Sequence, residues 1–323
     1  MAFQFSGKSV VVTGGAGFVG SHVVDAALDR GAKRVTVVDN FSTGFRELVR
    51  KDDRVVLAEG DLLDQPLLDK TFEGHDFVFH IAANADVKDG LKHPRKDVEQ
   101  NIVATQNVLE AMRKHGIKHV AFTSTGSTYG ESDVFPTPET APFPIQTSLY
   151  GTSKVAAEGL CTSYALGYGM TAHIFRLVSM LGPRYSHGHV IDFWRRLRKD
   201  PTKLEVLGDG HQKKSYLHVL DCVGGMFLVC EKAPASEPIH IYNVGHHEWI
   251  EVNDSIRIIC DQMKVKPTLS YSGGIRGWIG DSPKILLDNA KLRAFGWKPT
   301  KTIEEAIRET LAFLDANPYL DRA

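Results

Sequence analysis

The stretch "KSVVVTGGAGFVG", residues 8–20, decides the fold. A short β-branched run ends in glycines, and "SHVVDAALDRG" (21–31) follows with helical spacing. Gly14, Gly17 and Gly20 stand between the two elements. The early glycine permits a tight turn, the next lets the backbone approach a pyrophosphate, and the last permits close packing of helix on sheet. The stretch therefore predicts a dinucleotide-binding strand–turn–helix unit.

An acidic residue ends the second apolar run, "RVTVVDN" (34–40). Asp39 stands there, 25 residues after Gly14. A carboxylate at this place can accept hydrogen bonds from both hydroxyls of an adenosine ribose and would repel a 2'-phosphate. The pattern therefore predicts NAD rather than NADP as the cofactor. After the third run, "GDLLD" places Asp61 where it can approach the adenine edge.

Further apolar runs follow at regular intervals. They are "RVVLAEGDL" (54–62), "DFVFHIAA" (76–83) and "HVAFTST" (119–125), with the helical pattern of residues 97–116 before the last. Strands that alternate with helices predict a parallel sheet with helices on both faces. Because each run is apolar throughout rather than alternating, we expect the strands to be covered on both faces.

The rhythm of strand and helix breaks after residue 177, where loops carry glycine, histidine and charge. We therefore expect a doubly wound α/β (Rossmann) domain over residues 1–177 and a smaller, mainly substrate-binding C-terminal region over residues 178–323. Part of this region, near residues 215–245, is expected to return to the first domain. Within it, "PIHIYNVG" (238–245) reads as a strand that rejoins the main sheet.

Composition narrows the class of protein. The 323 residues are 42% hydrophobic and 24% charged, as in soluble globular proteins. A net charge of -1 gives no basic field, which argues against nucleic acid as the partner. The four cysteines form no CxxC pair, as expected of buried thiols in a reducing cytosol. No apolar run reaches the roughly 20 residues of a membrane span, and no signal-peptide layout is present. We expect a cytoplasmic protein without membrane partners.

A tyrosine and a lysine form the candidate acid–base pair. Tyr150 and Lys154 lie four residues apart in the helical pattern "YGTSKVAAEGL", hence on one face. A lysine ammonium near a phenol favours the phenolate and lowers the pKa of the tyrosine. Among nine tyrosines only Tyr150 has a lysine four residues later, which favours a catalytic pair over a chance surface pair.

Hydroxyl side chains concentrate just before this pair, in "TSTGSTYG" (123–130). The segment ends a predicted strand whose carboxyl end should open on the cofactor pocket. A serine or threonine there can shuttle a proton between a substrate hydroxyl and the phenolate of Tyr150. No carboxylate stands among residues 123–130, so the segment offers no acid to expel a leaving hydroxyl.

Together these motifs resemble the extended short-chain dehydrogenase/reductases, and among them nucleotide-sugar 4-epimerases of the UDP-glucose 4-epimerase type. The resemblance runs from about Lys8 to Leu314. Its motifs are "TGGAGFVG", "VVDNFSTG", "GDLLD", "HIAANADV", "NIVATQNVLEA", "YGTSKVAAE", "GPR", "KKSYLHVLD" and "GGIRGWIGDSPKILLD".

The resemblance implies a set of NAD contacts along the chain. They are Gly14, Gly17, Phe18 and Val19 at the pyrophosphate; Asp39, Asn40, Ser42, Thr43 and Gly44 at the adenosine ribose; Asp61 and Leu62 at adenine; Ala82, Ala83 and Asn84 along the cofactor; Tyr150 and Lys154 at the nicotinamide ribose; and Asn101 as a structural asparagine beside the active site.

The resemblance also implies the chemistry. Thr125 falls at the catalytic Ser/Thr position, with Ser124 as the alternative. In related 4,6-dehydratases a pair with at least one acid follows the catalytic threonine, whereas Gly126 and Ser127 stand here. Because dehydration needs that acid, the resemblance favours epimerisation at C4 through a transient 4-keto sugar.

The implied substrate is a nucleotide-diphosphate sugar, most simply a UDP-sugar. Arg276 resembles an arginine that clamps the diphosphate or nucleoside, with Asp281 nearby. Lys214 stands where many relatives carry a phosphate-binding arginine. Ser179, in "RLVS", replaces the asparagine of the usual "RYFN". Val190 falls in the same substrate-binding region.

Three other features are interpreted more simply. We expect no metal at His246, His247 and Glu248, because neighbouring residues of a strand point apart. His187 and His189 flank a glycine in a loop that can reach a sugar. The amphipathic segment 302–320 is expected to dock on its own chain.

The resemblance implies a homodimer that pairs the helices around residues 98–112 and 150–160 with their copies. Two alternative functions stay open. One is a dehydrogenase, reductase or decarboxylase acting on a similar substrate, and the other is an NAD-binding protein without catalysis, because fold alone does not separate them.

Overall fold

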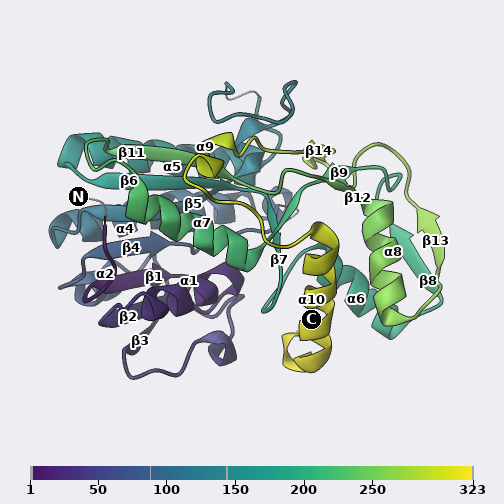
Figure 1. Cartoon of the computed structure of the whole chain (residues 1–323), viewed down its shortest axis with the longest axis horizontal. Coiled ribbons are helices and arrows are strands. Elements are labelled where there is room, and N and C mark those ends of the chain that lie inside the picture. The colour runs from purple at the N-terminus through teal and green to yellow at the C-terminus, as the bar shows by residue number, and fades with distance from the viewer. Residues whose placement is uncertain (1–2, 88, 143–144, 322–323) are drawn as a thin grey trace.

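The computed structural model describes residues 3–87, 89–142 and 145–321, and its main sheet has seven parallel strands, seen on the left of Figure 1. The strand order is β11-β6-β5-β4-β1-β2-β3. The strands are β1 (Ser9–Thr13), β2 (Arg34–Asp39), β3 (Val55–Glu59), β4 (Phe77–His80), β5 (His119–Thr125), β6 (Thr171–Leu177) and β11 (Ile239–Val244). This arrangement confirms the predicted doubly wound fold. The order reverses between β1 and β4, so a crevice opens at the carboxyl ends of these strands.

Helices cover both faces of the sheet. On one face α1 (Phe18–Asp29) contacts α7 (Val219–Lys232). On the other, α2 (Gln65–Phe72), α4 (Ala104–Lys114) and α5 (Leu149–Tyr168) lie next to one another. The two buried clusters follow the two-residue period of strands: Val10 and Val12 pack with α1 and α7, whereas Val11 packs with the other three helices. Burial on alternate sides explains why these runs are apolar throughout.

One strand departs from the prediction. We expected all runs to be covered on both faces, but in β3 the side chains of Val56 and Leu57 are 47% and 39% exposed. The reason is position, because β3 is the last strand of the sheet and has a neighbour on one side only.

The C-terminal region adds short strands and three longer helices beside the sheet (Figure 1). They are β7 (Ser179–Leu181), α6 (His189–Lys199), β8 (Lys203–Val206), β9 (Lys213–Lys214), β10 (Tyr216–His218), β12 (Ile250–Glu251), α8 (Val252–Met263), β13 (Thr268–Tyr271), β14 (Lys284–Ile285), α9 (Ala290–Arg293) and α10 (Ile303–Ala316). As the sequence predicts for residues 238–245, β11 returns to the main sheet and pairs with β6. The domain boundary at residue 177 stays a prediction.

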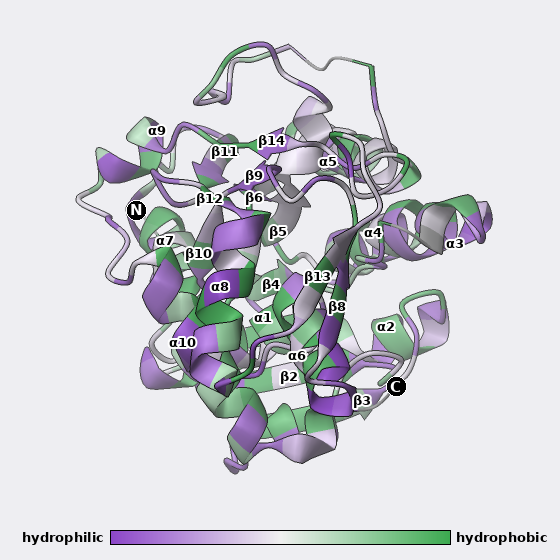
Figure 2. Cartoon of the chain, turned by 90° about the vertical axis from the view of Figure 1, so that its right-hand side faces the viewer, coloured by the Kyte–Doolittle hydropathy of each residue, from purple (hydrophilic) through white to green (hydrophobic). Residues whose placement is uncertain are grey.

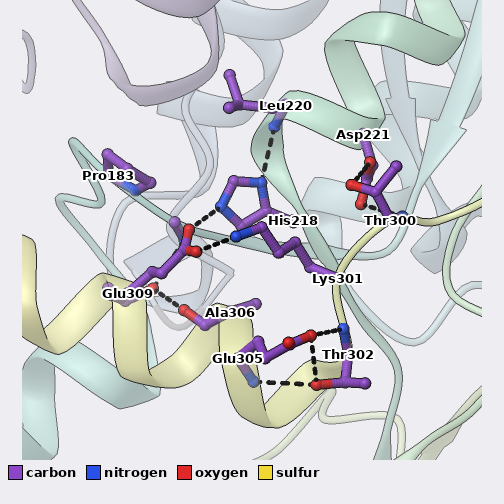
Figure 3. A network of polar contacts seen from close by, with 12 residues as sticks. Pro183, His218, Leu220, Asp221, Thr300, Lys301, Thr302, Glu305, Ala306 and Glu309 are labelled. Carbon is purple, nitrogen blue, oxygen red and sulfur yellow. Dashed lines mark hydrogen bonds and ion pairs between the residues drawn. The ribbon is translucent and has the colours of Figure 1, made fainter.

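A polar network fixes α10 on its own chain, where the sequence predicts it (Figure 3). His218 ends β10 and caps α7: its Nδ1 accepts the amide of Leu220 at 3.3 Å. Its Nε2 lies 3.0 Å from Oε2 of Glu309 on α10, and Lys301 contacts the other oxygen of that carboxylate. The helix therefore docks by specific polar contacts as well as by its apolar face. In Figure 2 the hydrophobic residues of α10 are green and its hydrophilic residues are purple.

Several imidazoles are enclosed within this fold. Burial lowers the pKa of His80 and of His173 to about 3, and that of His22 and of His75 to about 4. Each ring is therefore neutral in the folded protein at pH values where the unfolded chain already binds a proton. Between about pH 6.5 and pH 4 the unfolded state binds more protons, so the stability of the fold must rise with pH.

We expect the free energy of unfolding to fall by about 1.4 kcal/mol per pH unit for each buried histidine as the pH drops below about 6.5. Denaturant titrations at pH 7, 6 and 5 measure the slope. His173→Phe removes one of these groups from a site between aromatic rings and should reduce the slope by one such increment. An unchanged slope in this variant would contradict the assignment.

Candidate active site

The glycine turn after β1 has the geometry of a pyrophosphate cradle. Gly14 has φ +69°, and a Cβ there would lie 2.8 Å from backbone atoms of Ala82. A Cβ on Gly20 would lie 2.0 Å from the carbonyl oxygen of Gly14. Both positions therefore exclude a side chain, one to let the turn approach the end of β4 and the other to let α1 approach the turn.

The N-terminus of α1 faces the same turn. Gly17 is the N-cap and provides no capping side chain. The amides of the first turn, including those of Phe18 and Val19, have no partner within the helix and carry the positive end of its dipole. This is the anion site that the sequence predicts for the cofactor pyrophosphate.

Asp39 lies at the end of β2, next to the cradle. Its Oδ2 accepts the amide of Ala16 at 2.9 Å, and its Oδ1 accepts the amide of Phe41 at 2.9 Å. Burial raises the pKa of this carboxyl, and the two amides oppose the rise. A Cβ on Gly44 would lie 2.9 Å from Oδ1, so the following loop closes tightly over the carboxylate. The geometry fits an acceptor for ribose hydroxyls.

The loops after β2 and β3 meet at the predicted adenine edge. Nδ2 of Asn40 donates to Oδ2 of Asp61 at 2.8 Å, and Oδ1 of Asn40 accepts the amide of Ser42 at 3.0 Å. Ser42 and Thr43 are exposed. Leu62 is 6% exposed and packs in the core, so only its backbone can reach a ligand.

The loop after β4 is held by a buried asparagine pair. The amide of Asn84 donates to Oδ1 of Asn101 at 2.8 Å, and Nδ2 of Asn101 returns a bond to the Asn84 carbonyl at 3.1 Å. Asn101 lies in a π-helical segment, η3 (Val98–Val103), and also donates to Ser153 on α5 at 2.9 Å. Asn101 therefore connects the loop after β4 with α5, and its role beside the active site stays a prediction.

The side chain of Asn84 is engaged within the protein, and its place along the cofactor path stays a prediction. Its Nδ2 donates to Oδ1 of the buried Asp97 at 2.8 Å, so the loop offers a ligand mainly the backbone of Ala82 and Ala83. The sequence analysis missed Asp97; the only signal for it was helical spacing, since it stands four residues before Asn101.

The predicted catalytic residues come together at the carboxyl end of β5. Thr125 is the last residue of that strand, and its hydroxyl forms a hydrogen bond with Tyr150 in the first turn of α5. Nζ of Lys154, one turn later, donates to the carbonyl of Thr123 at 2.9 Å. Ser124 faces the other way: its Oγ donates to Glu158 Oε1 at 2.5 Å. Of the two hydroxyls proposed for proton transfer, only Thr125 contacts the tyrosine.

The pKa of the phenol differs from the expected direction. We expected Lys154 to lower it, but burial raises the pKa of Tyr150 to about 12. The hydrogen bond from Thr125 opposes this rise, and the charge of Asp97 adds to it. Burial also lowers the pKa of Lys154 to about 8. In the protein alone the phenol therefore keeps its proton at neutral pH.

Four charged residues gather where the resemblance places the diphosphate. Nζ of Lys214 lies 2.6 Å from Oδ1 of Asp281, and burial lowers the pKa of this lysine. Nη1 of Arg276 donates to the backbone carbonyl of Asp281 at 3.1 Å, and both Nη atoms bond to the carboxylate of Glu131. Both predicted cations, Lys214 and Arg276, thus contact Asp281. Glu131 also belongs to this charged group, and the sequence did not predict it.

The other predicted substrate residues differ in access. Ser179 begins β7 and is exposed, so its hydroxyl can reach a ligand. Val190 is fully buried in the core near the start of α6, which leaves its side chain unavailable. His189 bonds to Ser255 Oγ at 2.7 Å and serves packing, whereas His187 is exposed in the preceding loop.

The group His246, His247 and Glu248 lies in a loop after β11 and not on a strand. The expectation that its side chains point apart is therefore wrong, since their potential ligand atoms lie within 4.8 Å of one another. His246, however, accepts the amide of Glu248 on Nδ1 at 3.1 Å and also bonds to the backbone of Lys301. The ring of His246 is thus bound to the backbone of the chain.

The parallel sheet, the glycine turn at its switch point and the Thr125–Tyr150–Lys154 set define a short-chain dehydrogenase/reductase. The chain matches the sequence model of the NAD dependent epimerase/dehydratase family over residues 10–245 and belongs to that family. Its cofactor is NAD, which the cradle and Asp39 fit. No helix in the described part of the chain is both long and apolar enough to cross a membrane.

Known relatives cover nearly the whole chain. A UDP-glucose 4-epimerase of Corynebacterium glutamicum is 30% identical over 327 residues, which cover 95% of this chain and 96% of that protein. The crystal structure of a UDP-galactose 4-epimerase is 37% identical with a TM-score of 0.86, covering 96% and 99% of the two chains. A dTDP-glucose 4,6-dehydratase of Actinoplanes sp. is 29% identical and covers 95% and 98%. This chain is therefore similar to proteins that are named for two different reactions, epimerisation and dehydration.

Asp39→Ala should weaken NAD binding and raise the relative affinity for NADP at least about tenfold, because two ribose hydroxyls lose a charged acceptor and the 2'-phosphate loses a repelling charge. Calorimetric titration with both dinucleotides measures the ratio. Asp209→Ala, at a half-buried aspartate in the loop between β8 and β9, is the control. An unchanged ratio would exclude Asp39 from the ribose site.

Proposed function

We propose that this protein epimerises a nucleotide-diphosphate sugar at C4, of the UDP-glucose/UDP-galactose type, through a transient 4-keto sugar. The observation that carries the proposal is the contact of Thr125 with Tyr150 at the carboxyl end of β5. Lys154 follows one helical turn later, and residues 123–130 contain no carboxylate. The names of the epimerase relatives support the same reaction.

The protein contributes proton transfer and orientation. Tyr150 takes the proton of the sugar C4 hydroxyl, directly or through Thr125. The hydroxyl of Thr125 is held in place because it accepts the amide of Ser127 at 3.1 Å. Lys154 is fixed by the Thr123 carbonyl, and it would hold the nicotinamide ribose. NAD supplies the hydride acceptor and, when oxidised, one positive charge.

Burial raises the pKa of Tyr150 to about 12 in the protein alone. With its proton bound at neutral pH, the phenol is an acid and not a base. A nearby positive charge stabilises the phenolate and lowers the pKa. A bound oxidised cofactor would add such a charge and would favour the phenolate of Tyr150.

Dehydration fits the site less well. A 4,6-dehydratase needs an acid beside the catalytic threonine, and Gly126 and Ser127 occupy those positions. The next carboxylate along the chain is Glu131, which is bound to Arg276. A dehydrogenase, reductase or decarboxylase of the same family remains the second candidate, because it would use the same Thr125 and Tyr150. A protein that binds NAD without catalysis has no need of this pair.

Substrate binding is assigned to the charged group on the C-terminal side. Arg276 and Lys214 are the cations proposed for the diphosphate. Ser179 is exposed at the start of β7. It stands at the position where the family that the sequence resembles usually has an asparagine. The sugar lies toward Thr125 and Tyr150.

Purified protein given UDP-glucose, without added NAD, should form UDP-galactose with no net NADH, as followed by proton NMR of the anomeric signals and by near-ultraviolet absorbance. Tyr150→Phe should slow the reaction at least about 100-fold, because the acid–base group is lost. Tyr168→Phe, at an exposed tyrosine of the same helix, is the control.

Other products decide between the alternatives. Turnover that consumes added NAD indicates a dehydrogenase, and a 4-keto-6-deoxy product indicates a dehydratase. If neither UDP-sugar reacts, the same assay with N-acetylated and uronic-acid nucleotide sugars tests the sugar class. No reaction with any of them, with NAD bound, contradicts the epimerase proposal.

We also propose that the protein is a homodimer. Apolar side chains are exposed on and beside η3 and α5: Val98 is 48% exposed, Val103 38% and Leu166 68%. A hollow of about 840 Å³ lies there, lined by Pro94, Val98, Val103 and Leu149 among others. Apolar surface of this kind is typical of a protein interface.

Val98→Glu should convert the dimer to a monomer, because a charge would be buried at the interface. Light scattering after size-exclusion chromatography measures the mass. Val56→Glu, at an equally exposed valine on the edge strand β3, should leave the dimer intact. A monomeric wild type would contradict the proposal.

A further inference from the structure

Both cations proposed for the diphosphate are already paired with carboxylates of this chain. Lys214 and Asp281 form a buried pair, with side chains 13% and 4% exposed. Arg276 and Glu131 form a half-exposed pair, with side chains 38% and 42% exposed. The charges of the four groups cancel, so a diphosphate approaching this site meets no free cation among them.

The two carboxylates differ in what else they hold. Asp281 organises its own loop, since its Oδ2 accepts the amide of Gly277 at 3.0 Å and its backbone carbonyl accepts Arg276 at 3.1 Å. Within the described residues, the carboxylate of Glu131 bonds only to Arg276. Removing Asp281 would disturb the loop, whereas Glu131 can leave the guanidinium without breaking another bond of its side chain.

The contact of Glu131 with Arg276 joins the two sides of the crevice. Glu131 follows β5 and the short helix η4 (Gly126–Tyr129), close to the catalytic Thr125 in sequence. Arg276 lies in the loop between β13 and β14, which approaches the same place because Ser282 donates to the carbonyl of Gly130 at 3.4 Å. The ion pair therefore lies between the catalytic strand and the proposed diphosphate loop.

The pairing is bidentate: Nη1 and Nη2 of Arg276 each donate to one oxygen of Glu131. A guanidinium presents this same pair of donors to a phosphate group. Since one edge of the fork binds one such anion at a time, carboxylate and diphosphate compete for it.

We propose that Glu131 is a substrate-site residue that occupies the fork of Arg276 and is displaced by the diphosphate of the nucleotide sugar. This inference rests on the proposed function. Glu131 thereby lowers the affinity of the site for a nucleoside diphosphate and favours release of the product. Because half-exposed ion pairs are weak, the competition is modest and a diphosphate with at least two negative charges overcomes it.

The test is calorimetric binding of UDP, dTDP and GDP to the NAD-loaded protein. Glu131→Gln keeps the shape of the side chain and removes its charge, so UDP should bind about two- to fivefold more tightly than to the wild type. Arg276→Gln should weaken binding at least about tenfold. Adding Glu131→Gln to Arg276→Gln should bring no gain, because the fork is gone.

Glu304→Gln is the matched control, since Glu304 pairs with the comparably exposed Arg308 on α10, far along the chain from the site. Circular dichroism and thermal unfolding verify the fold of each variant. Unchanged binding by Glu131→Gln overturns the inference, and weaker binding overturns it in favour of a carboxylate that orients Arg276. If NAD binds but no nucleoside diphosphate does, the proposed function fails together with the inference.

Discussion

The ion pair between Glu158 and Arg176 holds together the elements that carry the active site. Two buried charges are costly unless their hydrogen bonds are satisfied. Here Nη2 of Arg176 bonds to Oε2 of Glu158 at 2.7 Å and Nε to Oε1 at 3.0 Å, while Ser124 donates its hydroxyl to the same carboxylate. The remaining edge of the guanidinium bonds to the hydroxyl of Tyr129 at 2.7 Å, and that hydroxyl donates to Asn243 of β11. One network thus connects α5 with β5, β6 and β11.

The position of this network explains the geometry of the proposed chemistry. Glu158 lies one helical turn after Lys154 on α5, and Ser124 directly precedes Thr125 on β5. Because consecutive strand residues face opposite sides, Ser124 points to the buried ion pair while Thr125 points to Tyr150. Of the two neighbouring hydroxyls, the one proposed for proton transfer is thus the one that does not bond to the buried ion pair. A strand and a helix cross-linked so near the reacting groups keep the tyrosine and threonine within hydrogen-bonding distance.

Local patterns in the sequence were sufficient for the sheet, the glycine turn, Asp39 and the Tyr150–Lys154 pair, since each depends on spacing within a single strand, turn or helix. What the sequence could not provide depends on distant partners. The hydroxyl of Ser124 meets a carboxylate 34 residues away. The raised pKa of Tyr150 reflects burial by the whole fold, and the neighbours His246 and His247 stack because they lie in a loop.

The two ends of the proposed substrate site share one electrostatic property. At the catalytic end, burial keeps the proton on Tyr150, and a positive charge is needed to release it. At the diphosphate end, Glu131 and Asp281 neutralise Arg276 and Lys214, and a stronger anion is needed to engage the arginine. The cofactor and the nucleotide provide these opposite charges. Under the proposed function, the bound cofactor would favour the phenolate of Tyr150, and the bound diphosphate would displace Glu131 from Arg276.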